Sequence, residues 1–477
     1  MASKKITIEP VTRVEGHGKV VIHMDENNNV EQARLHIVEF RGFERFIQGR
    51  PYWEVPVTVQ RLCGICPVSH HLAAAKAMDR IVGGENLTPT AEKMRRLMHY
   101  GQTFQSHSLH FFHLCSPDLL FGFDADVAIR NVIGVAAKYP DLAVQGVMMR
   151  KYGQEIIKAT AGKKIHGTGA IPGGINKNLS IEERDGFLKD IDQMLEWGRG
   201  ALKIAKDYTV ENLEKVADFG SFDSNHMSLV RADGAMDLYH GNLRAIDKDG
   251  NRILDDIDYQ DYCEYVAEEV RPWSYMKFPF LKQLGPENGW YRVGPLARIN
   301  ACDFIDTPEA EAARKEFMAV TEDKPNNITM AYHWARMIEN LHAVEKIRDL
   351  LNDKDLQGTD LVVKGERRDE TVGLIEAPRG TLFHHYKVDK NDQVVMANLI
   401  VSTTNNNEPM NRAVTKVAQD HLSGKPEISE GLLNHIEVAI RAYDPCLSCA
   451  THAMGQMPLN VTLVDCEGTV VDSRIKD

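Results

Sequence analysis

Hydrophobic and polar positions alternate with a period of two near the start of the chain. The segments KITIEP (5–10), KVVIHMD (19–25) and VEQARLHIVEF (30–40) carry apolar or β-branched residues in alternation or short runs. Three asparagines at 27–29 are typical of a turn. The pattern predicts an antiparallel sheet at the N-terminus.

The middle of the chain changes to a helical period. The dipeptide Thr-Pro at 88–89 predicts a helix start, because threonine caps a helix and proline suits its first position. A stripe of apolar residues with helical spacing follows it to Cys115. Thr-Pro at 307–308 and the amphipathic run 331–351 predict two further helices.

Ser180 and Glu183 form the pattern of a capping box, which opens a helical run through Ala205. Short strands return at 371–407, and residues 458–473 are typical of a hairpin that turns at 467–468. No repeat or low-complexity linker divides the chain. The predicted fold class is therefore helix-rich α+β, with an N-terminal antiparallel sheet and a bundle of long helices.

Composition narrows the class of protein. The 477 residues are 43% hydrophobic and 26% charged, as in ordinary globular proteins. No apolar run approaches the ~20 residues of a membrane span, and the first residues lack a signal-peptide pattern. We therefore expect a cytoplasmic protein. The net charge of −12 argues against nucleic acid as a partner.

The chemistry is concentrated in two cysteine pairs at opposite ends of the chain, Cys63 with Cys66 and Cys446 with Cys449. A CxxC turn directs both sulfurs to one side and can clamp a soft metal. A structural zinc site and a thioredoxin-type redox pair are the alternatives, although zinc ribbons keep their pairs close in sequence. Closing so long a loop costs about 5 kcal/mol. The fold itself must therefore bring both chain ends to one buried metal site.

Seven motifs give the chain a resemblance to the large, catalytic subunit of nickel-iron hydrogenases, most like the soluble NAD-reducing, bidirectional branch. They are VTRVEGH (11–17), FRGFE (40–44), RLCGICPVSH (61–70), RVGPLARIN (292–300), EAPRGTLFHHYKVD (376–389), VSTTNNN (401–407) and DPCLSCATH (444–452). The resemblance covers nearly the whole chain. It implies reversible heterolytic cleavage of H2 into two protons and two electrons.

The resemblance also implies the metal ligands. Cys63 and Cys446 would bind nickel alone, while Cys66 and Cys449 would bridge nickel to an iron that carries CO and CN. The pocket around that iron would be formed by Pro378, Arg379, Ser402 and Thr403. A plain polar turn is the alternative for the Ser-Thr segment.

H2 carries no charge, so its uneven splitting needs a base. A coordinated thiolate can take up a proton and pass it on, and we expect Cys446 to do so. By the resemblance, Glu15 is the next proton carrier. Its alternative is a buried carboxylate paired with Arg13 or His17.

Arg379 would lie over the open metal position, where we expect its charge to act by electrostatic positioning because arginine keeps its proton. Asp118 and Asp444 would hold it by charge-assisted bonds, with a helix cap as the alternative for Asp118. His70 would donate to a bridging sulfur, unless it is simply a packed histidine.

Glu44 and His452 match ligands of a hydrated Mg²⁺ in the family, although one imidazole is unusual for that ion and iron or zinc could take its place. Glu44 could also be a surface carboxylate beside Arg45 or Arg50. The glycines in GTGAIPGG (167–174) are wrongly spaced for a dinucleotide loop.

The other cysteines lack iron-sulfur spacing, so iron-sulfur clusters, flavin and the NAD site would lie on partner chains: a diaphorase module and a small iron-sulfur subunit. The resemblance predicts one domain over 1–453, plus an extension over 454–477 that a maturation protease removes after nickel-insertion proteins act.

Three other functions are alternatives to an NAD-linked enzyme: a regulatory hydrogen sensor, a hydrogenase with another soluble acceptor, and the quinone-site subunit of respiratory complex I. The last lacks the four cysteines, which are all present here.

Overall fold

The computed structural model describes residues 4–40, 42–425, 427–450, 459–464 and 470–476. The predicted N-terminal sheet is present: β1 (Lys4–Ile8), β2 (Gly18–Met24) and β3 (Val30–Ile37) pair antiparallel in that order. The turn between β2 and β3 is closed by Asp25, whose Oδ1 accepts from the backbone N–H groups of Asn27 and Asn29 at 2.8 Å each.

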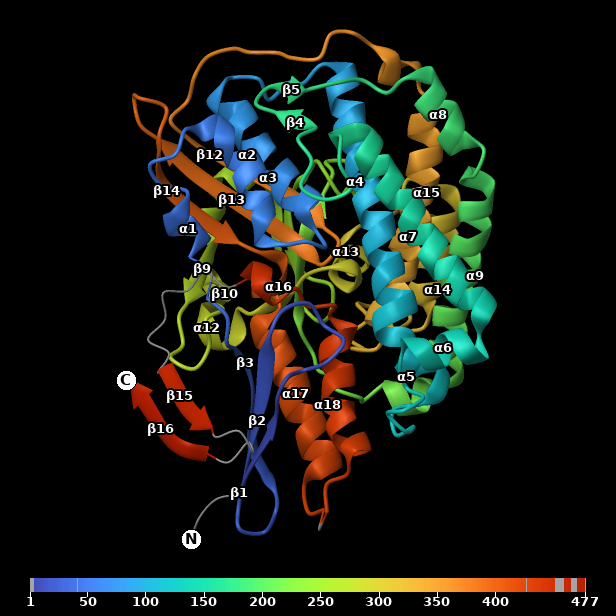
Figure 1. Cartoon of the computed structure of the whole chain (residues 1–477), viewed down its shortest axis with the longest axis vertical. Helices are drawn as coiled ribbons and strands as arrows, with labels where there is room; N and C mark the ends of the chain where they lie inside the picture. The colour runs from blue at the N-terminus through green and yellow to red at the C-terminus, as the bar shows by residue number, and fades with distance from the viewer. Residues whose placement is uncertain (1–3, 41, 426, 451–458, 465–469, 477) are drawn as a thin grey trace.

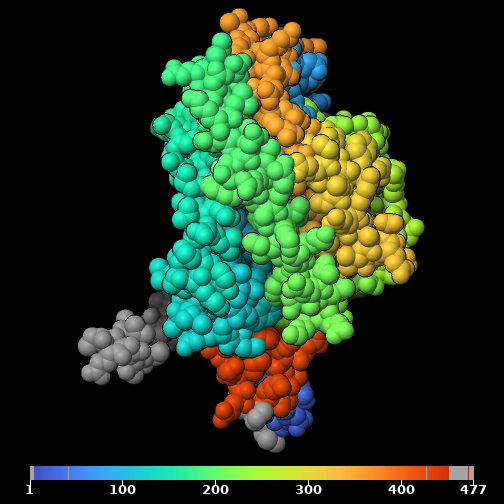
Figure 2. Space-filling view, turned by 90° about the vertical axis from the view of Figure 1, so that its right-hand side faces the viewer, coloured from blue at the N-terminus to red at the C-terminus, as the bar shows by residue number. Residues whose placement is uncertain are grey.

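The long helices form the predicted bundle (Figure 1). Thr88 caps α4 (Pro89–Leu109) by accepting from the Ala91 N–H. Helix α4 packs against α7 (Pro140–Ala161) and α15 (Ala331–Leu351), and α15 packs on α9 (Ile191–Glu211). Figure 2 shows the outer face of this bundle, with α7 in teal and α8 and α9 in green.

Two helical predictions needed revision. The Ser180–Glu183 capping box is present, but α8 ends early and a separate helix, α9, begins after it. The apolar stripe that predicted one helix as far as Cys115 is also interrupted. Helix α4 ends at Leu109, and residues 110–115 form a π-helical turn before α5. Helix α14 follows Thr307 as predicted.

Two more of the described sheets have three or more strands. Strands β12 (Glu370–Ala377), β13 (Gly380–Val388) and β14 (Val394–Ile400) form an antiparallel sheet against α3 (Pro67–Ile81). A second sheet has the order β11-β6-β7-β8, in which β11 runs parallel to β6. The sequence pattern did not predict this second sheet.

The remaining bounds are as follows: α1 (Phe43–Phe46), α2 (Val55–Thr58), α5 (Ser116–Phe121), α6 (Val132–Lys138), α8 (Ile181–Leu188), α10 (Leu213–Val216), α11 (Tyr262–Tyr265), α12 (Gly285–Asn288), α13 (Pro295–Ala301), α14 (Pro308–Ala319), α16 (Ser402–Asn405), α17 (Asn407–Leu422), α18 (Glu430–Ala442), β4 (Ala170–Ile171), β5 (Gly174–Ile175), β6 (Asn225–Val230), β7 (Asn242–Ile246), β8 (Arg252–Ile257), β9 (Val266–Glu269), β10 (Phe278–Leu281), β11 (Tyr291–Arg292), β15 (Leu459–Val464) and β16 (Val470–Lys476).

Strands β15 and β16 pair antiparallel, as the predicted C-terminal hairpin requires, while its turn lies outside the described residues. In the described part of the chain, no helix combines the length and apolar character of a membrane span.

The two ends of the chain meet beside the core. In Figure 1 the blue N-terminal sheet lies beside the red-orange helices α17 and α18. The Leu447 N–H donates to the Glu15 carbonyl at 2.9 Å, and Arg441 Nε donates to the Thr12 carbonyl at 3.0 Å. Gly16 is needed here, because a Cβ at this residue would lie 2.6 Å from the Ser448 nitrogen. The predicted convergence of both ends is confirmed.

Glycine also permits the close packing of α4 on α7, and this gives a stability prediction. A Cβ at Gly153 would lie 2.6 Å from the Gly101 carbonyl oxygen, whereas one at the exposed Gly200 in α9 meets nothing within 4 Å. Gly153→Ala should lower the free energy of unfolding by about 1–3 kcal/mol through overpacking. Gly200→Ala should raise it by about 0.5–1 kcal/mol. Thermal melts of both variants check the opposite signs, and two shifts of the same sign would contradict the packing argument.

Candidate metal centre

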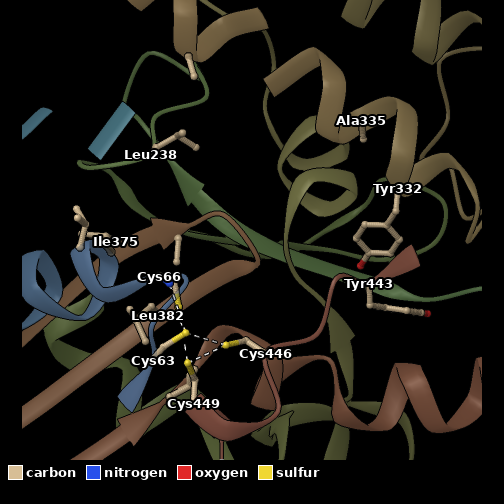
Figure 3. Packing of buried hydrophobic residues seen from close by; sticks show 14 of the residues in the cluster. Cys63, Cys66, Leu238, Tyr332, Ala335, Ile375, Leu382, Tyr443, Cys446 and Cys449 are labelled. Carbon is tan, nitrogen blue, oxygen red and sulfur yellow. Dashed lines mark hydrogen bonds between the residues drawn. The ribbon is translucent and has the colours of Figure 1, made fainter. Parts of the chain in front are cut away.

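The four cysteine sulfurs lie together in the buried interior (Figure 3). The Sγ–Sγ distances are 3.2 Å between Cys63 and Cys446, 3.6 Å between Cys66 and Cys449, and 2.9 Å between Cys446 and Cys449. Sulfurs held tetrahedrally about 2.3 Å from one metal lie about 3.8 Å apart. The group therefore has the size of a clamp around a metal, formed by both ends of the chain.

Local contacts position the two CxxC turns, and two backbone N–H groups can stabilise a negative charge on Cys63 Sγ. The tight turn before α3 directs the N–H groups of Ile65 and Cys66 at Cys63 Sγ, at 3.2 and 3.3 Å. In the loop after α18, the Cys446 N–H donates to Thr403 Oγ1 at 2.9 Å, which fixes the start of the second CxxC turn. The first clamp is therefore set by its own turn, and the second by a contact with Thr403 of α16.

The thiols differ in their readiness to ionise. Hydrogen bonds from Cys446 and Cys449 hold the pKa of the Cys63 thiol well below its usual value. Burial raises the pKa of the Cys446 and Cys449 thiols well above theirs. Four adjacent thiolates in a dry interior need a cation to balance their charge. The donor set therefore fits a soft transition metal.

A small cavity of about 10 Å³ adjoins the sulfurs. Ala377, Pro378, Leu382 and Val401 line much of it with apolar groups. The polar lining comes from Ser69, His70, Arg379, Ser402 and Thr403. Such a lining suits small, weakly polar ligands and leaves few places for water.

Arg379 reaches this cavity from the turn between β12 and β13. Its NH2 donates to Asp444 Oδ1 at 2.9 Å and its NH1 to Ser106 Oγ at 3.2 Å. Burial opposes its charge, but Asp444 and the cysteine sulfurs raise the pKa of the guanidinium above its usual value. Arg379 is therefore a fixed positive charge here.

Asp118 does not hold Arg379 in this structure, contrary to the prediction. Its carboxylate accepts from Arg13 at 2.6 Å and from Arg441 at 3.0 Å. Burial alone would raise the pKa of Asp118, but these guanidinium groups lower it below its usual value. The residue instead ties the N-terminal segment to α18.

Glu15 lies against the second clamp. Its Oε2 accepts from Cys446 Sγ at 3.0 Å and from the Ser448 N–H at 3.2 Å, and the Ser448 hydroxyl donates to its Oε1. The alternative partners are engaged elsewhere, because Arg13 binds Asp118 and His17 binds Glu39. Glu15 is therefore placed to exchange a proton with Cys446.

His70 lines the cavity from α3. Its Nδ1 lies 3.1 Å from His384 Nε2, and His384 Nδ1 lies 2.6 Å from the Tyr386 hydroxyl. Burial lowers the pKa of His70 to about 4, so the ring is neutral near pH 7. Its buried Nε2 has no hydrogen-bond partner among the described residues, so the predicted donation to a bridging sulfur is not observed. This orphan atom suits a ligand in the cavity.

The Ser402 and Thr403 hydroxyls first support the loops around the cavity. Ser402 Oγ donates to the Gly380 carbonyl at 2.8 Å, so that proton is used. Thr403 Oγ1 accepts from the Cys446 N–H, and the hydroxyl proton of Thr403 takes no part in that bond.

Glu44 belongs to a separate polar group. Its Oε1 accepts from the Leu399 N–H at 2.8 Å and lies 3.4 Å from Lys277 Nζ. Lys277 also contacts Glu268 at 3.3 Å and Asn398 Oδ1 at 3.1 Å. Burial raises the pKa of Glu44. His452, its predicted partner, lies outside the described residues.

A second buried group of soft ligands, His110, Cys115 and His333, lies away from the clamp. Burial lowers the pKa of both imidazoles, and so does the positive charge of Arg336 nearby. That charge opposes a bound cation, so we assign no metal to this group.

Several site residues were missed from the sequence. Ser448 lies inside the second CxxC, where a hydroxyl beside two ligands was an available signal. Ser106, His384 and Lys277 carried no such signal, because their contacts join segments far apart in the chain.

Fold and site together define a protein with a buried soft-metal centre formed by both chain ends. A sequence profile described as HoxL-like matches residues 5–40, and one described as Nickel-dependent hydrogenase matches residues 41–128 and 212–452. The chain belongs to the nickel-dependent hydrogenase family.

Individual relatives agree with this assignment. The chain is 51% identical to the NAD-reducing hydrogenase HoxS subunit beta of Cupriavidus necator, over 99% of this chain and 100% of the relative. It is 43% identical to an F420-non-reducing hydrogenase subunit from Methanothermobacter thermautotrophicus, over 98% and 99% of the two chains.

Solved structures share the fold. An NAD⁺-reducing NiFe-hydrogenase in the H2-reduced state gives a TM-score of 0.93 at 57% identity, over 95% of this chain and 100% of that chain. A NiFeSe-hydrogenase of Dm. baculatum, 23% identical with a TM-score of 0.76 over 94% and 100% of the two chains, shows the fold alone.

The clamp geometry predicts which cysteines retain nickel. Cys446→Ser should reduce bound nickel to near zero, because a serine hydroxyl does not replace a thiolate as a soft ligand. Cys263→Ser should leave nickel unchanged, since Cys263 is exposed and outside the clamp. Elemental analysis of purified protein compares the two variants, and full nickel in Cys446→Ser would contradict the assignment.

Proposed function

We propose that this chain is the catalytic subunit of a nickel-iron hydrogenase that cleaves H2 heterolytically and reversibly, with electrons passing through partner subunits to NAD⁺. One observation carries the proposal: four buried sulfurs from both chain ends lie between a carboxylate, Glu15, and a guanidinium, Arg379. The 51% identity to a protein named for NAD reduction supports the acceptor.

In this proposal Cys63 and Cys446 would hold nickel, and Cys66 and Cys449 would hold both nickel and an iron that would carry CO and CN. When bound, this centre supplies metal orbitals that polarise H2 and accept its electrons. The apolar wall of the cavity suits CO, and three polar groups on its lining that have no partner among the described residues, Ser69 Oγ, His70 Nε2 and Arg379 Nε, can donate to CN.

Glu15 is the proton acceptor in this proposal. The Cys446 sulfur lies 3.0 Å from Glu15 Oε2, within direct proton-transfer distance. The Ser448 hydroxyl holds the opposite oxygen, Oε1, so the carboxylate cannot rotate away from the sulfur without losing that bond. A proton released at Cys446 therefore has a positioned base beside it.

Arg379 acts through its charge. Asp444 and Ser106 hold two of its three nitrogens, which leaves Nε without a hydrogen-bond partner among the described residues. Its raised pKa keeps the proton on the guanidinium, so it stabilises negative charge at the cavity rather than taking a proton.

We also propose Mg²⁺ beside Glu44. Glu44, Glu268 and Asn398 direct oxygen atoms, the ligands that this hard cation prefers, at Lys277 Nζ, so Mg²⁺ would have to displace that ammonium. Lys277 balances only one of the two carboxylate charges. His452 would complete the set.

The electron route leaves through the first clamp. The cysteines of this clamp are buried, but Arg61 and Gly64 beside them are exposed. His166 Nε2 lies 3.0 Å from the Cys63 carbonyl oxygen and fixes this loop at the surface. We place the iron-sulfur small subunit here, and the flavin and NAD site on a diaphorase module beyond it. Both relatives are named as hydrogenase subunits, which supports a hetero-oligomer.

The function is tested with the purified hetero-oligomer. We expect nickel at about one per chain, as four thiolates around one ion imply, with infrared bands of CO and CN and H2-dependent reduction of NAD⁺. Dye reduction without NAD⁺ reduction would indicate another acceptor. Slow turnover with every acceptor would indicate a hydrogen sensor. Full metal content without any H2 oxidation would reject the enzyme.

Residues 454–477 form the proposed C-terminal extension of a single domain over 1–453, in a cytoplasmic protein. A maturation protease would cut after residue 452 or 453, once nickel-insertion proteins have loaded the site. Mass spectrometry of active enzyme from a nickel-replete host should find a chain that ends at the cut, and an intact Asp477 on active enzyme would disprove removal.

Replacing the carboxylate tests the proton step. Glu15→Gln keeps the shape of the side chain but removes its basicity, so H2 oxidation should fall at least about 100-fold. Nickel content should stay unchanged, because Glu15 is not a proposed ligand. Glu26→Gln, at an exposed turn, is the matched control and should retain activity. Wild-type rates in Glu15→Gln would require a different base.

A further inference from the structure

Arg298 lies wholly buried in α13 and uses all five of its N–H donors. Nε and NH2 bind the two oxygens of Glu339 at 2.5 and 2.6 Å, and NH1 binds Glu376 Oε2 at 2.8 Å. The other two donors bind the carbonyl oxygens of Ala377 at 2.9 Å and Pro378 at 3.2 Å. One rigid fork therefore joins α13 to α15, to β12 and to the turn after β12.

The two carbonyls belong to the residues directly before Arg379. Ala377 and Pro378 form the start of the turn between β12 and β13, and both line the cavity. Because the guanidinium is planar, its donors fix the orientation of two consecutive peptide groups relative to α13. The backbone path into Arg379 is therefore set by a side chain from another segment.

The same network is linked to the side-chain end of Arg379. Glu339 Oε2 also lies 3.0 Å from His107 Nε2 in α4. The neighbouring residue in α4 is Ser106, whose hydroxyl accepts from Arg379 NH1. Glu376 accepts from the Leu229 N–H at 2.9 Å and from Thr381 Oγ1 at 2.7 Å. The backbone and the guanidinium of Arg379 are thus held by segments that Arg298 and its partner Glu339 connect.

We propose that Arg298 is a positioning residue for Arg379: its contacts with the Ala377 and Pro378 carbonyls hold the Arg379 side chain over the cavity beside the sulfur clamp. The kinetic part of this proposal rests on the proposed function. The structural part does not, because it concerns the turn itself.

The chain offers a matched control in Arg95. This arginine is equally buried and binds Asp79 through NH1 and NH2 at 2.5 and 2.9 Å. It also binds the carbonyls of Ile171 and Gly174, both at 2.8 Å. These partners lie outside the turn before Arg379, so Arg95→Lys breaks a similar network elsewhere.

The experiment measures amide hydrogen exchange by mass spectrometry in the peptide 375–383, in the purified complex. Lysine cannot reproduce the fork, so Arg298→Lys should speed exchange in this peptide by about fivefold or more, and Arg95→Lys should leave it unchanged. Equal exchange in Arg298→Lys and wild type, or equal acceleration in both variants, would overturn the proposal.

Kinetics supply the second readout. With nickel retained, Arg298→Lys should lower kcat for H2 oxidation by about 10- to 100-fold, as expected when a charged group shifts at a reacting centre. Arg95→Lys with the same nickel content should retain kcat, and an equal loss in both variants would make the effect merely structural. If the wild-type complex does not oxidise H2, the proposed function fails, while the exchange result still decides the role of Arg298.

If Arg298→Lys does not fold, Glu339→Gln takes its place. This isosteric change removes the charge that anchors Arg298 from the side opposite the turn. We expect a smaller rise of exchange in the same peptide, about twofold or more, because the effect must pass through Arg298. Unchanged exchange in a folded Glu339→Gln would count against the proposal.

Discussion

The structure depends on one long-range contact, the pairing of the N-terminal segment around Glu15 with the loop that carries Cys446. Its loop closure costs about 5 kcal/mol, and a metal ion is a poor organiser of so long a loop. Backbone bonds from Leu447 to Glu15 and side-chain bonds from Arg441 to Thr12 offset that cost within the protein. The clamp is therefore a product of the fold, into which the metal can enter late.

Around this closure, each key charge is buried with a partner. Arg379 has Asp444, Asp118 has Arg13 and Arg441, and Arg298 has two glutamates. Buried ion pairs add little stability over apolar packing, but breaking one strands a charge in a dry interior. The ion pairs therefore serve mainly to fix the positions of these side chains rather than to add stability. They fix where positive charge stands relative to the sulfurs, and the nearby apolar wall keeps that charge from being screened by water.

Local patterns predicted local structure well. Helix α15 spans the residues whose periodicity predicted it, and Thr88 caps α4 because its side chain acts on its own neighbours. The CxxC pairs predicted the site because each is a complete local clamp. The prediction for Asp118 was wrong for the opposite reason. Its partner Arg441 lies 323 residues away, and no local pattern shows that Asp118 binds Arg441 rather than Arg379. The π-helical turn and the β6–β8 sheet likewise depend on tertiary packing.

Leu447 and Ser448, the two residues between the cysteines of the second CxxC, both contact Glu15. Leu447 pairs with the Glu15 backbone, while Ser448 binds the Glu15 carboxylate through its N–H and its hydroxyl. The contact that joins the chain ends therefore also places Glu15, the proposed base, 3.0 Å from the Cys446 sulfur. Arg379 is held from one side by β12, α4 and α13, and from the other by Asp444, which lies two residues before Cys446 in the same loop. The proposed base and the guanidinium thus share the loop at 444–449 as an anchor, so a displacement of that loop moves both groups.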